Sequence, residues 1–212
     1  MSVRKSPSWF LWLLVGGVLA VYVWSAIGPK DRFTWWLETF YTPVVLPLLI
    51  FTWRRFPFTT LVYTLIAIHL CILSIGGHYT YAEVPLFNWI RDSFELSRNH
   101  YDRLGHFLQG FVPAMIVREV LLRRSPLVPG KWLFFLVTCV CLAISAAFEL
   151  FEWAVAIATG EQADAFLATQ GDPWDTQWDM FMALIGAISA QFAFARLQDR
   201  QLHVLKQSSS VP

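Results

Sequence analysis

The chain has 212 residues, of which 56% are hydrophobic and only 15% are charged. Because soluble domains carry roughly 25% charged residues, this composition predicts a protein embedded in a lipid bilayer. The net charge of +1 and the lack of a basic face or run exclude a nucleic-acid-binding protein. The length favours a single domain over residues 1–212.

Six apolar segments follow one another along the chain, and each approaches or exceeds the roughly 20 residues that cross the apolar core of a bilayer. They are residues 9–27, 37–53, 56–75, 104–122, 132–158 and 177–197. The second segment is short and contains Pro43 and Pro47, so it either spans the bilayer or re-enters on one side. The pattern predicts an all-α polytopic integral membrane protein with about six transmembrane helices.

The longest connection, residues 76–103, contains a further helical pattern. Pro85 suits the first turn of a helix, and Leu86, Ile90 and Phe94 recur every four residues. We therefore expect a short amphipathic helix that lies on the membrane surface. Such a helix would either be a linker that covers the bundle or act as a lid over a site.

The basic residues are divided unequally between the two sides that six crossings define. The side of the chain termini holds 11 of the 16 Lys and Arg residues, namely Arg4, Lys5, Arg54, Arg55, Arg118, Arg123, Arg124, Lys131, Arg196, Arg200 and Lys206. Because Lys and Arg are enriched in cytoplasmic segments, this distribution predicts that both termini are cytoplasmic. Of the 15 acidic residues, only Glu119 and Asp199 lie near that side.

Two acids interrupt the fifth apolar segment, in the stretch "SAAFELFEWAVA". At 1.5 Å per residue, Glu149 and Glu152 lie about 25 and 30 Å from the start of that helix, in its outer third. His106 and Asp179 each lie about one turn inside the outer surface, on the fourth and sixth segments. We predict that these three helices are neighbours and that the four side chains share one outward-facing pocket.

The cost of burying charge favours a functional role for the two glutamates. An ionised acid at mid-helix costs about 2.5–3.5 kcal/mol on insertion scales, and two like charges on adjacent turns repel each other. A proton or a cation is therefore expected to compensate them. Carboxylate and imidazole groups suit Mg²⁺, Mn²⁺ or Zn²⁺, so we predict a divalent cation bound by Asp102, His106, Glu149, Glu152 and Asp179. Glu149, Glu152 and His106 are the predicted catalytic residues.

Polar residues at helical spacing add further candidates for the pocket: His78, Gln109, Asp172, Asp175 and Arg103. Several of the polar residues also have a simpler interpretation. Asp175 would suit the N-cap of the sixth helix, and Asp102 would pair with a neighbouring arginine such as Arg98 or Arg103. His69, in the third segment, would suit a structural hydrogen bond.

Four motifs carry a family resemblance: "GGHYTYAEVPLF", "LSRNHYDRLGHFLQGFVPA", "ELFEW" and "ADAFLATQGDPWDTQWDM". Together they resemble the YjdF family of bacterial inner-membrane proteins, over residues 9–197 and most densely over 76–190. The resemblance implies a bacterial inner membrane location and a multi-pass topology, but it implies no reaction.

A weaker similarity is to VanZ-like membrane proteins, at Asp102 to His106, at Glu149 with Glu152 and at Asp179 to Gly186. The chain departs from that pattern at Arg103, Glu152 and Ala183, so no catalytic assignment is carried over.

Three classes of function remain open at this stage. A cation-dependent enzyme acting on a lipid or envelope substrate would use the acids and His106 at an outward-facing site. A proton-linked transporter or small-ligand binding module would exchange protons among the same residues. A non-catalytic envelope assembly protein would need none of them. The sequence contains no metalloprotease, P-loop or nucleophile-elbow motif that would select a reaction.

Overall fold

The fold is a bundle of long helices, described here in a computed structural model that covers residues 7–160 and 164–209. The predicted cytoplasmic residues Arg4 and Lys5 lie outside the described residues. Over the described ranges the chain forms nine helices and no strand, which confirms the all-α prediction. The helices are α1 (Ser8–Ser25), α2 (Arg32–Thr39), α3 (Tyr41–Thr52), α4 (Thr60–His78), α5 (Pro85–Ser93), α6 (Tyr101–Arg124), α7 (Lys131–Thr159), α8 (Asp164–Leu167) and α9 (Asp175–Ser209).

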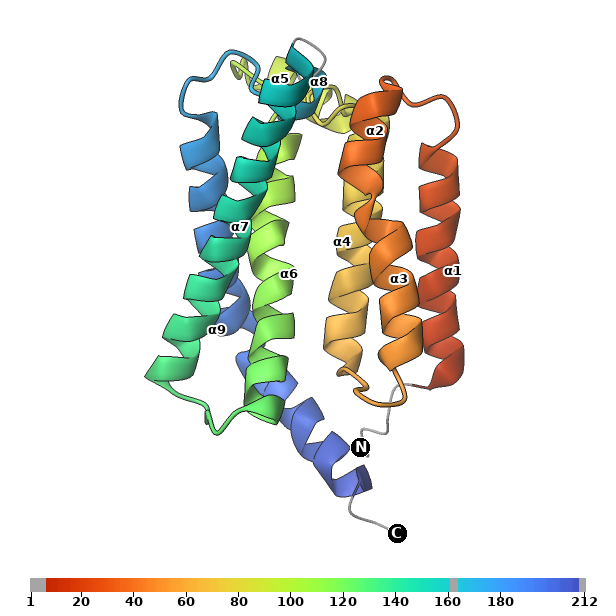
Figure 1. The fold of residues 1–212 in the computed structure, drawn as a ribbon, viewed down its shortest axis with the longest axis vertical. Helices are drawn as coiled ribbons and strands as arrows, with labels where there is room; N and C mark the ends of the chain where they lie inside the picture. Colours follow the sequence, from red (N-terminus) through yellow and green to blue (C-terminus); the bar gives the residue numbers. More distant parts are fainter. Residues whose placement is uncertain (1–6, 161–163, 210–212) are drawn as a thin grey trace.

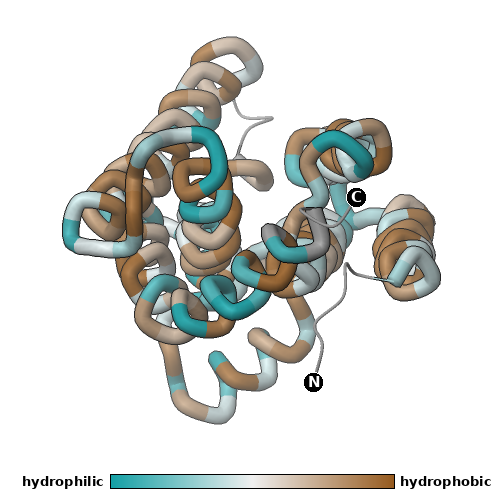
Figure 2. Tube along the Cα trace, turned by 90° about the horizontal axis from the view of Figure 1, so that it is seen from below, coloured by the Kyte–Doolittle hydropathy of each residue, from teal (hydrophilic) through white to brown (hydrophobic). Residues whose placement is uncertain are grey.

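The long helices run side by side, and the short helices α5 and α8 lie together at one end of the bundle, here called the loop end (Figure 1). The opposite end, where α1 begins and α9 ends, is the terminal end. The helix predicted in the 76–103 connection is present as α5, and its placement on the membrane surface stays a prediction. Figure 2, viewed from the terminal end, shows hydrophobic residues (brown) predominating along the helices.

Five stretches are long and apolar enough to cross a bilayer: Ser8–Ser25, Arg32–Thr52, Thr60–His78, Lys131–Thr159 and Asp175–Leu205. The remaining predicted span, the fourth segment at 104–122, is α6, which is 24 residues long and is not among these five. It packs against α4, α7 and α9. Because α6 lies among other helices, its polar residues need not face lipid. This arrangement confirms that the predicted fourth, fifth and sixth helices are neighbours.

The second predicted span, residues 37–53, is two helices rather than one. Helix α2 ends at Thr39 and α3 begins at Tyr41. Pro43 explains the break, because proline has no amide hydrogen to donate to the carbonyl four residues earlier, that of Thr39, and its ring clashes with that carbonyl. The two helices together, from Arg32 to Thr52, are nevertheless long enough to span. The break leaves Glu38 at the end of α2, inside the bundle.

Helices α6 and α9 approach each other closely at two glycines. A Cβ atom on Gly110 of α6 would overlap the carbonyl oxygen of Ala183, and one on Gly186 of α9 would overlap the carbonyl oxygen of Phe107. Small residues at such an interface let helix backbones touch. The close contact fixes the height of α9 relative to α6 and so sets Asp179 beside His106.

A buried polar network joins α4, α6 and α9 near the terminal end, where sequence reasoning expected few intramembrane polar groups. The fully buried carboxylate of Glu119 accepts hydrogen bonds from the amide and hydroxyl of Thr59 and from Arg123. Arg118 donates to Gln198 at 2.9 Å and to Asp199 at 3.0 Å. These contacts satisfy the polar groups and tie the helix ends together.

Candidate functional site

A cavity of about 480 Å³ lies between α2, α3 and α4 on one side and α6 and α7 on the other. This volume is within the range of roughly 300–1,000 Å³ that is usual for small-molecule sites. Its polar lining gathers on the loop-end parts of the helices and consists of Glu38, Tyr41, His69, Tyr81, Asp102, His106, Gln109 and Glu152. Its apolar lining lies nearer mid-helix and includes Val45, Ile66, Leu70, Val112, Ile116 and Ile144.

His106 lies among carboxylates from three helices. Its Nε2 is 3.5 Å from Asp102 Oδ1 and 3.7 Å from Asp179 Oδ1, and its Nδ1 is 3.7 Å from Glu149 Oε1. The side-chain oxygen of Gln109 is 3.2 Å from the same Nδ1. The structure therefore brings together His106, Asp102, Glu149, Asp179 and Gln109. All four of the ionisable side chains are buried.

Glu152 lies one turn further along α7 and lines the cavity. Its charge interacts with those of His106, Glu149 and Glu38. Glu149 points instead toward α9, where it approaches Thr176, and its Oε1 has no hydrogen-bond partner among the described residues. The two glutamates thus flank His106 without making the same contacts.

Two arginines hold the aspartates that precede and begin α9. Arg103 donates to Asp175 at 2.6 Å and to Asp172 at 3.3 Å, and it makes a close ion pair with Asp179. Arg98 donates to Asp175 at 2.5 Å and to the carbonyl oxygens of Ala168 and Thr169.

Of the pocket candidates, Arg103, Asp172 and Asp175 belong to this ion-pair network and do not line the cavity. Asp102 lies 3.6 Å from Arg98 and 3.5 Å from Arg103, so the simpler interpretation of Asp102 as an arginine partner also has support.

The structure does not bring His78 to the cavity, which corrects its place among the pocket candidates. His78 is the last residue of α4 and packs against α1. Its Nδ1 is 3.0 Å from the carbonyl oxygen of Ser25, and its ring stacks on Trp24 at 4.6 Å between centroids. The sequence places His78 near the loop end, but the face of α4 that carries it is turned away from α6.

Three further polar side chains line the cavity, and sequence reasoning did not select them as site residues. Glu38 is buried on α2, with no Lys, Arg or His within ion-pair distance among the described residues. The Nε2 of His69 has no hydrogen-bond partner there, so the expected structural hydrogen bond of His69 is not seen at that nitrogen. Glu38 is the residue before the end of α2 at Thr39, where the break between α2 and α3 lies.

Tyr81 is the third of these residues, and its placement requires special local structure. Its backbone has a φ of +55°, which is uncommon for a residue with a side chain. Its ring fills space left by Gly76 and Gly105, because a Cβ on either glycine would press on the ring. The hydroxyl has no hydrogen-bond partner of ordinary geometry among the described residues. Burial, together with the carboxyl of Glu38, raises the pKa of the phenol well above its usual value of 10, so the hydroxyl keeps its proton.

Asp102, His106 and Asp179 each offer one ligand atom, and these atoms lie within 4.8 Å of one another. A divalent cation needs such a group of oxygen and nitrogen donors. Arg103 already contacts Asp179 and would compete for it. In the described part of the chain, however, carboxylates outnumber cations in this region. Three cations, Arg98, Arg103 and His106, face seven acids: Glu38, Asp102, Glu149, Glu152, Asp172, Asp175 and Asp179.

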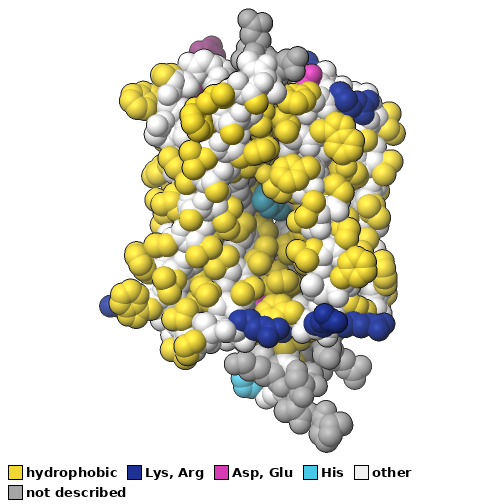
Figure 3. Space-filling model, in the orientation of Figure 1, with side chains coloured by type: hydrophobic (Ala, Val, Ile, Leu, Met, Phe, Trp, Pro, Cys, Tyr) yellow, Lys and Arg dark blue, Asp and Glu magenta, His cyan; other side chains and the backbone are white. Residues whose placement is uncertain are grey.

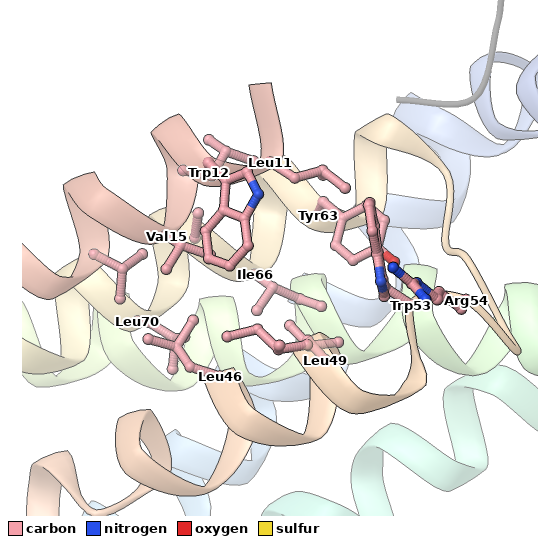
Figure 4. A pocket seen from close by; sticks show the side chains of 14 residues that line it. Leu11, Trp12, Val15, Leu46, Leu49, Trp53, Arg54, Tyr63, Ile66 and Leu70 are labelled. Atoms are coloured by element: carbon pink, nitrogen blue, oxygen red, sulfur yellow. The ribbon is translucent and has the colours of Figure 1, made fainter. Parts of the chain in front are cut away.

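A second hollow, of about 200 Å³, lies between α1, α3 and α4 nearer the terminal end. Figure 4 shows Trp12, Val15, Leu46, Leu49 and Ile66 around it, with Trp53, Tyr63 and Arg54 at one side. The lining is almost wholly apolar and brings no acid or histidine into contact. The acid-lined cavity is therefore the candidate functional site.

Comparison with known proteins identifies the family. The family described as "Predicted membrane protein (DUF2238)" matches residues 10–200 of the chain. The chain belongs to this family. It is also 50% identical to the protein named "Inner membrane protein YjdF" of Escherichia coli (strain K12) over 182 residues, which cover 86% of this chain and 87% of that protein. No solved structure matches. The resemblance to the YjdF family is thus confirmed, and the weaker similarity to VanZ-like proteins stays a prediction.

Proposed function

We propose that the protein is an enzyme of the bacterial inner membrane whose cation-dependent site faces the periplasm and acts on a lipid or another envelope substrate. The observation that carries the proposal is the position of His106, which lies within 3.7 Å of Asp102, Glu149 and Asp179 at the wall of a 480 Å³ cavity. Inner-membrane placement follows the name of the Escherichia coli relative. The periplasmic direction follows the basic residues, several of which line the terminal end in Figure 3 (dark blue).

The proposed roles follow from the chemistry of the side chains. Asp102, His106 and Asp179 would hold a divalent cation, with Glu149 and Glu152 as the other candidate ligands, and the cation would polarise a phosphoryl or carbonyl oxygen of the substrate. Glu149 or Glu152 would accept the proton of an attacking water, because each lies beside the cluster and has no arginine partner among the described residues. Gln109 would orient His106 through its side-chain oxygen.

A transport function fits the cavity less well. Between Gln109 and Arg118 on α6 lies about 13 Å of helix, and Val112, Ala114 and Met115 in that interval are buried in the apolar core. Proton-linked transport would require a polar path across this layer. The cavity therefore favours chemistry or binding at one side of the membrane over passage through it.

Metal analysis of the purified protein tests the proposal. We expect about one Mn²⁺ or Zn²⁺ per chain, measured by elemental analysis after dialysis and by calorimetric titration. Asp102→Asn, His106→Gln and the double variant Glu149→Gln with Glu152→Gln should each weaken binding at least tenfold. Asp92→Asn is the matched control, because Asp92 is an exposed carboxylate on α5 that pairs with Arg91.

Two results would count against a cation-dependent enzyme. One is metal binding in the site variants equal to that of Asp92→Asn. The other is acid-dependent proton uptake by a metal-free protein that is lost in the glutamate double variant, which would favour the transporter. An assembly role would be favoured if every site variant supported growth and envelope integrity as the unaltered chain does.

A further inference from the structure

The acid-lined cavity opens sideways, toward the part of the surface that a bilayer would cover. Figure 3 shows a hollow in the middle of this face, with a histidine side chain (cyan) inside it and hydrophobic side chains (yellow) on both sides. The residues of α3 and α7 that line the cavity include Tyr41, Val45, Ile144, Ala147 and Phe148. Ile144 and Ala147 are themselves exposed on the outer face of α7.

The two sides of the opening touch only lightly. Helices α3 and α7 are not among the pairs with extensive contact, whereas α4 and α6 pack together behind the cavity. Near the loop end two ring pairs meet across the opening, with centroids 6.2 Å apart for Phe40 and Phe151 and 6.3 Å apart for Tyr41 and Phe148, which are contact distances for aromatic rings. On the mid-membrane side of these rings, Val45 of α3 and Ile144 of α7 line the cavity, and a chain in the bilayer could enter there without crossing the loop end.

The lining matches an amphiphile in its order as well as in its chemistry. Most of the polar side chains lie toward the loop end, with His69 further in beside Leu70, and aliphatic side chains such as Val45, Ile66 and Ile116 lie toward mid-membrane. A lipid in the leaflet on that side has the same order, with its head group toward the loop end and its alkyl chain toward the middle. Burying an alkyl chain against this wall gains little when the chain comes from lipid, because both surroundings are apolar. Selectivity must therefore come from the head group.

The charge of the lining favours a cationic head group. Three acids, Glu38, Asp102 and Glu152, line the cavity together with the histidines His69 and His106, and no Lys or Arg lines it among the described residues. Asp102 already lies within ion-pair distance of Arg98, Arg103 and His106, which leaves Glu38 and Glu152. Glu38 and Glu152 both line the cavity, and neither has a cationic partner within 4.0 Å among the described residues. The arginines that neutralise the neighbouring aspartates point instead toward the start of α9.

The buried hydroxyl of Tyr81 is an independent sign of a ligand. It lines the cavity, is held there by a left-handed backbone conformation and has no hydrogen-bond partner of ordinary geometry among the described residues, its nearest acceptor being the carboxyl group of Glu38. A buried polar group without a partner is destabilising, and strained backbone is often found at binding sites. With Glu38 and Glu152 it supplies three acceptors, which equals the number of donors on a primary ammonium group.

We infer that the cavity binds a long-chain amphiphile with a protonated amino head group, which enters from the bilayer between α3 and α7 and is held by Glu38, Glu152 and Tyr81. The inference rests on the proposed function only in taking this cavity as the substrate site. It does not require the cation. Glu152 is shared with the proposed function, where it is a candidate cation ligand and proton acceptor, so amine binding is measured with metal removed.

A chain-matched set of probes tests the inference. Tetradecylamine, tetradecanol and tetradecyl phosphate share one alkyl chain and differ in head-group charge. Binding to the purified full chain is measured by native mass spectrometry and by competition in lipid nanodiscs at pH 7, with a chelator present to remove metal. We expect the amine to bind at least tenfold more tightly than the alcohol and the phosphate.

Variants locate the binding site. Glu38→Gln with Glu152→Gln should reduce amine binding at least tenfold, and Tyr81→Phe should reduce it severalfold. Ala147→Trp should block binding by filling the opening from an exposed position of α7, where a larger side chain is not expected to unfold the protein. Glu83→Gln is the control, because Glu83 is a half-exposed loop carboxylate paired with Lys30.

The inference is overturned if the phosphate or the alcohol binds as tightly as the amine, or if Ala147→Trp and Tyr81→Phe bind the amine as the control does. The last two variants keep the test decisive should the glutamate double variant fail to fold. Failure here is distinct from failure of the proposed function. If the protein binds metal but shows no preference for the amine, the cation-dependent enzyme is still supported and the present inference is wrong. If it prefers the amine but binds no metal, only the present inference is supported.

Discussion

Arg103 is the residue on which the ion-pair network between α6 and α9 depends most, and replacing it should be costly. Its side chain is 9% exposed and lies within ion-pair distance of Asp102, Asp172, Asp175 and Asp179. In Arg103→Met the side chain remains about as long but carries no charge. Removing one partner from a buried ion pair leaves an uncompensated charge, which costs about 3–5 kcal/mol.

The four carboxylates would not be affected equally by Arg103→Met. Asp175 would keep Arg98 at 2.5 Å, and Asp102 would keep Arg98 at 3.6 Å and His106 at 3.5 Å. Asp179, which is 2% exposed, would keep only His106 at 3.7 Å. Asp179 therefore carries most of the cost, and adding Asp179→Asn to Arg103→Met should restore more stability than adding Asp175→Asn.

The assay is thermal unfolding in detergent micelles, followed by tryptophan fluorescence. At roughly 2–4 °C per kcal/mol for a chain of this size, a loss of about 3–5 kcal/mol lowers the Tm by about 6–20 °C. Arg91→Met is the matched control, because Arg91 pairs with Asp92 on the surface of α5 and exposed pairs contribute about 0–1 kcal/mol. Equal losses in Arg103→Met and Arg91→Met, or better rescue by Asp175→Asn, would refute the reasoning.

Three further predictions concern helix packing, the terminal end and topology. Gly110→Ala or Gly186→Ala should destabilise the fold by about 1–3 kcal/mol, because the added methyl group would meet the backbone of the facing helix. In the control Gly16→Ala the methyl group meets nothing within 4 Å, so the Tm should not fall. Glu119→Ala should cost about 3–5 kcal/mol because it strands Arg123 and the Thr59 donors, yet leave amine binding in the cavity unchanged; altered amine binding would link the two regions. Reporter fusions after residues 55 and 125 should read cytoplasmic and those after 98 and 168 periplasmic, and a periplasmic reading at 55 would show that Arg32–Thr52 does not cross.

The helical framework could be predicted from the sequence because the bilayer imposes strong constraints on it. Every backbone polar group in the apolar core must be bonded within a helix, so apolar length alone locates most spans. The predicted neighbours α6, α7 and α9 followed from matching the depths of His106, Glu149 and Asp179, since buried charges must meet one another. The structure places these side chains within ion-pair distance of His106.

The rest of the cavity could not be predicted because it depends on local backbone geometry and on which helix face is turned inward. Glu38 points into the bundle only because the helix stops at Thr39, four residues before Pro43. Tyr81 enters through a left-handed turn that no sequence pattern marks. His78 and His69 lie nine residues apart on α4, and periodicity alone does not say which of them faces α6.

The acidic residues around His106 fall into two groups once each arginine is assigned to the carboxylates that it contacts. Arg98 and Arg103 both contact Asp175, and Arg103 also holds Asp179, so their positive charge is used at the start of α9. Those contacts join residues more than 70 positions apart, which is a structural role that accounts for the aspartates. It does not account for Glu38 and Glu152, which line the cavity on the other side of His106 with no arginine beside them. A fold that needed only stability would gain by replacing these two buried acids with apolar side chains. Their presence beside a 480 Å³ cavity therefore supports our inference that a positively charged ligand binds there.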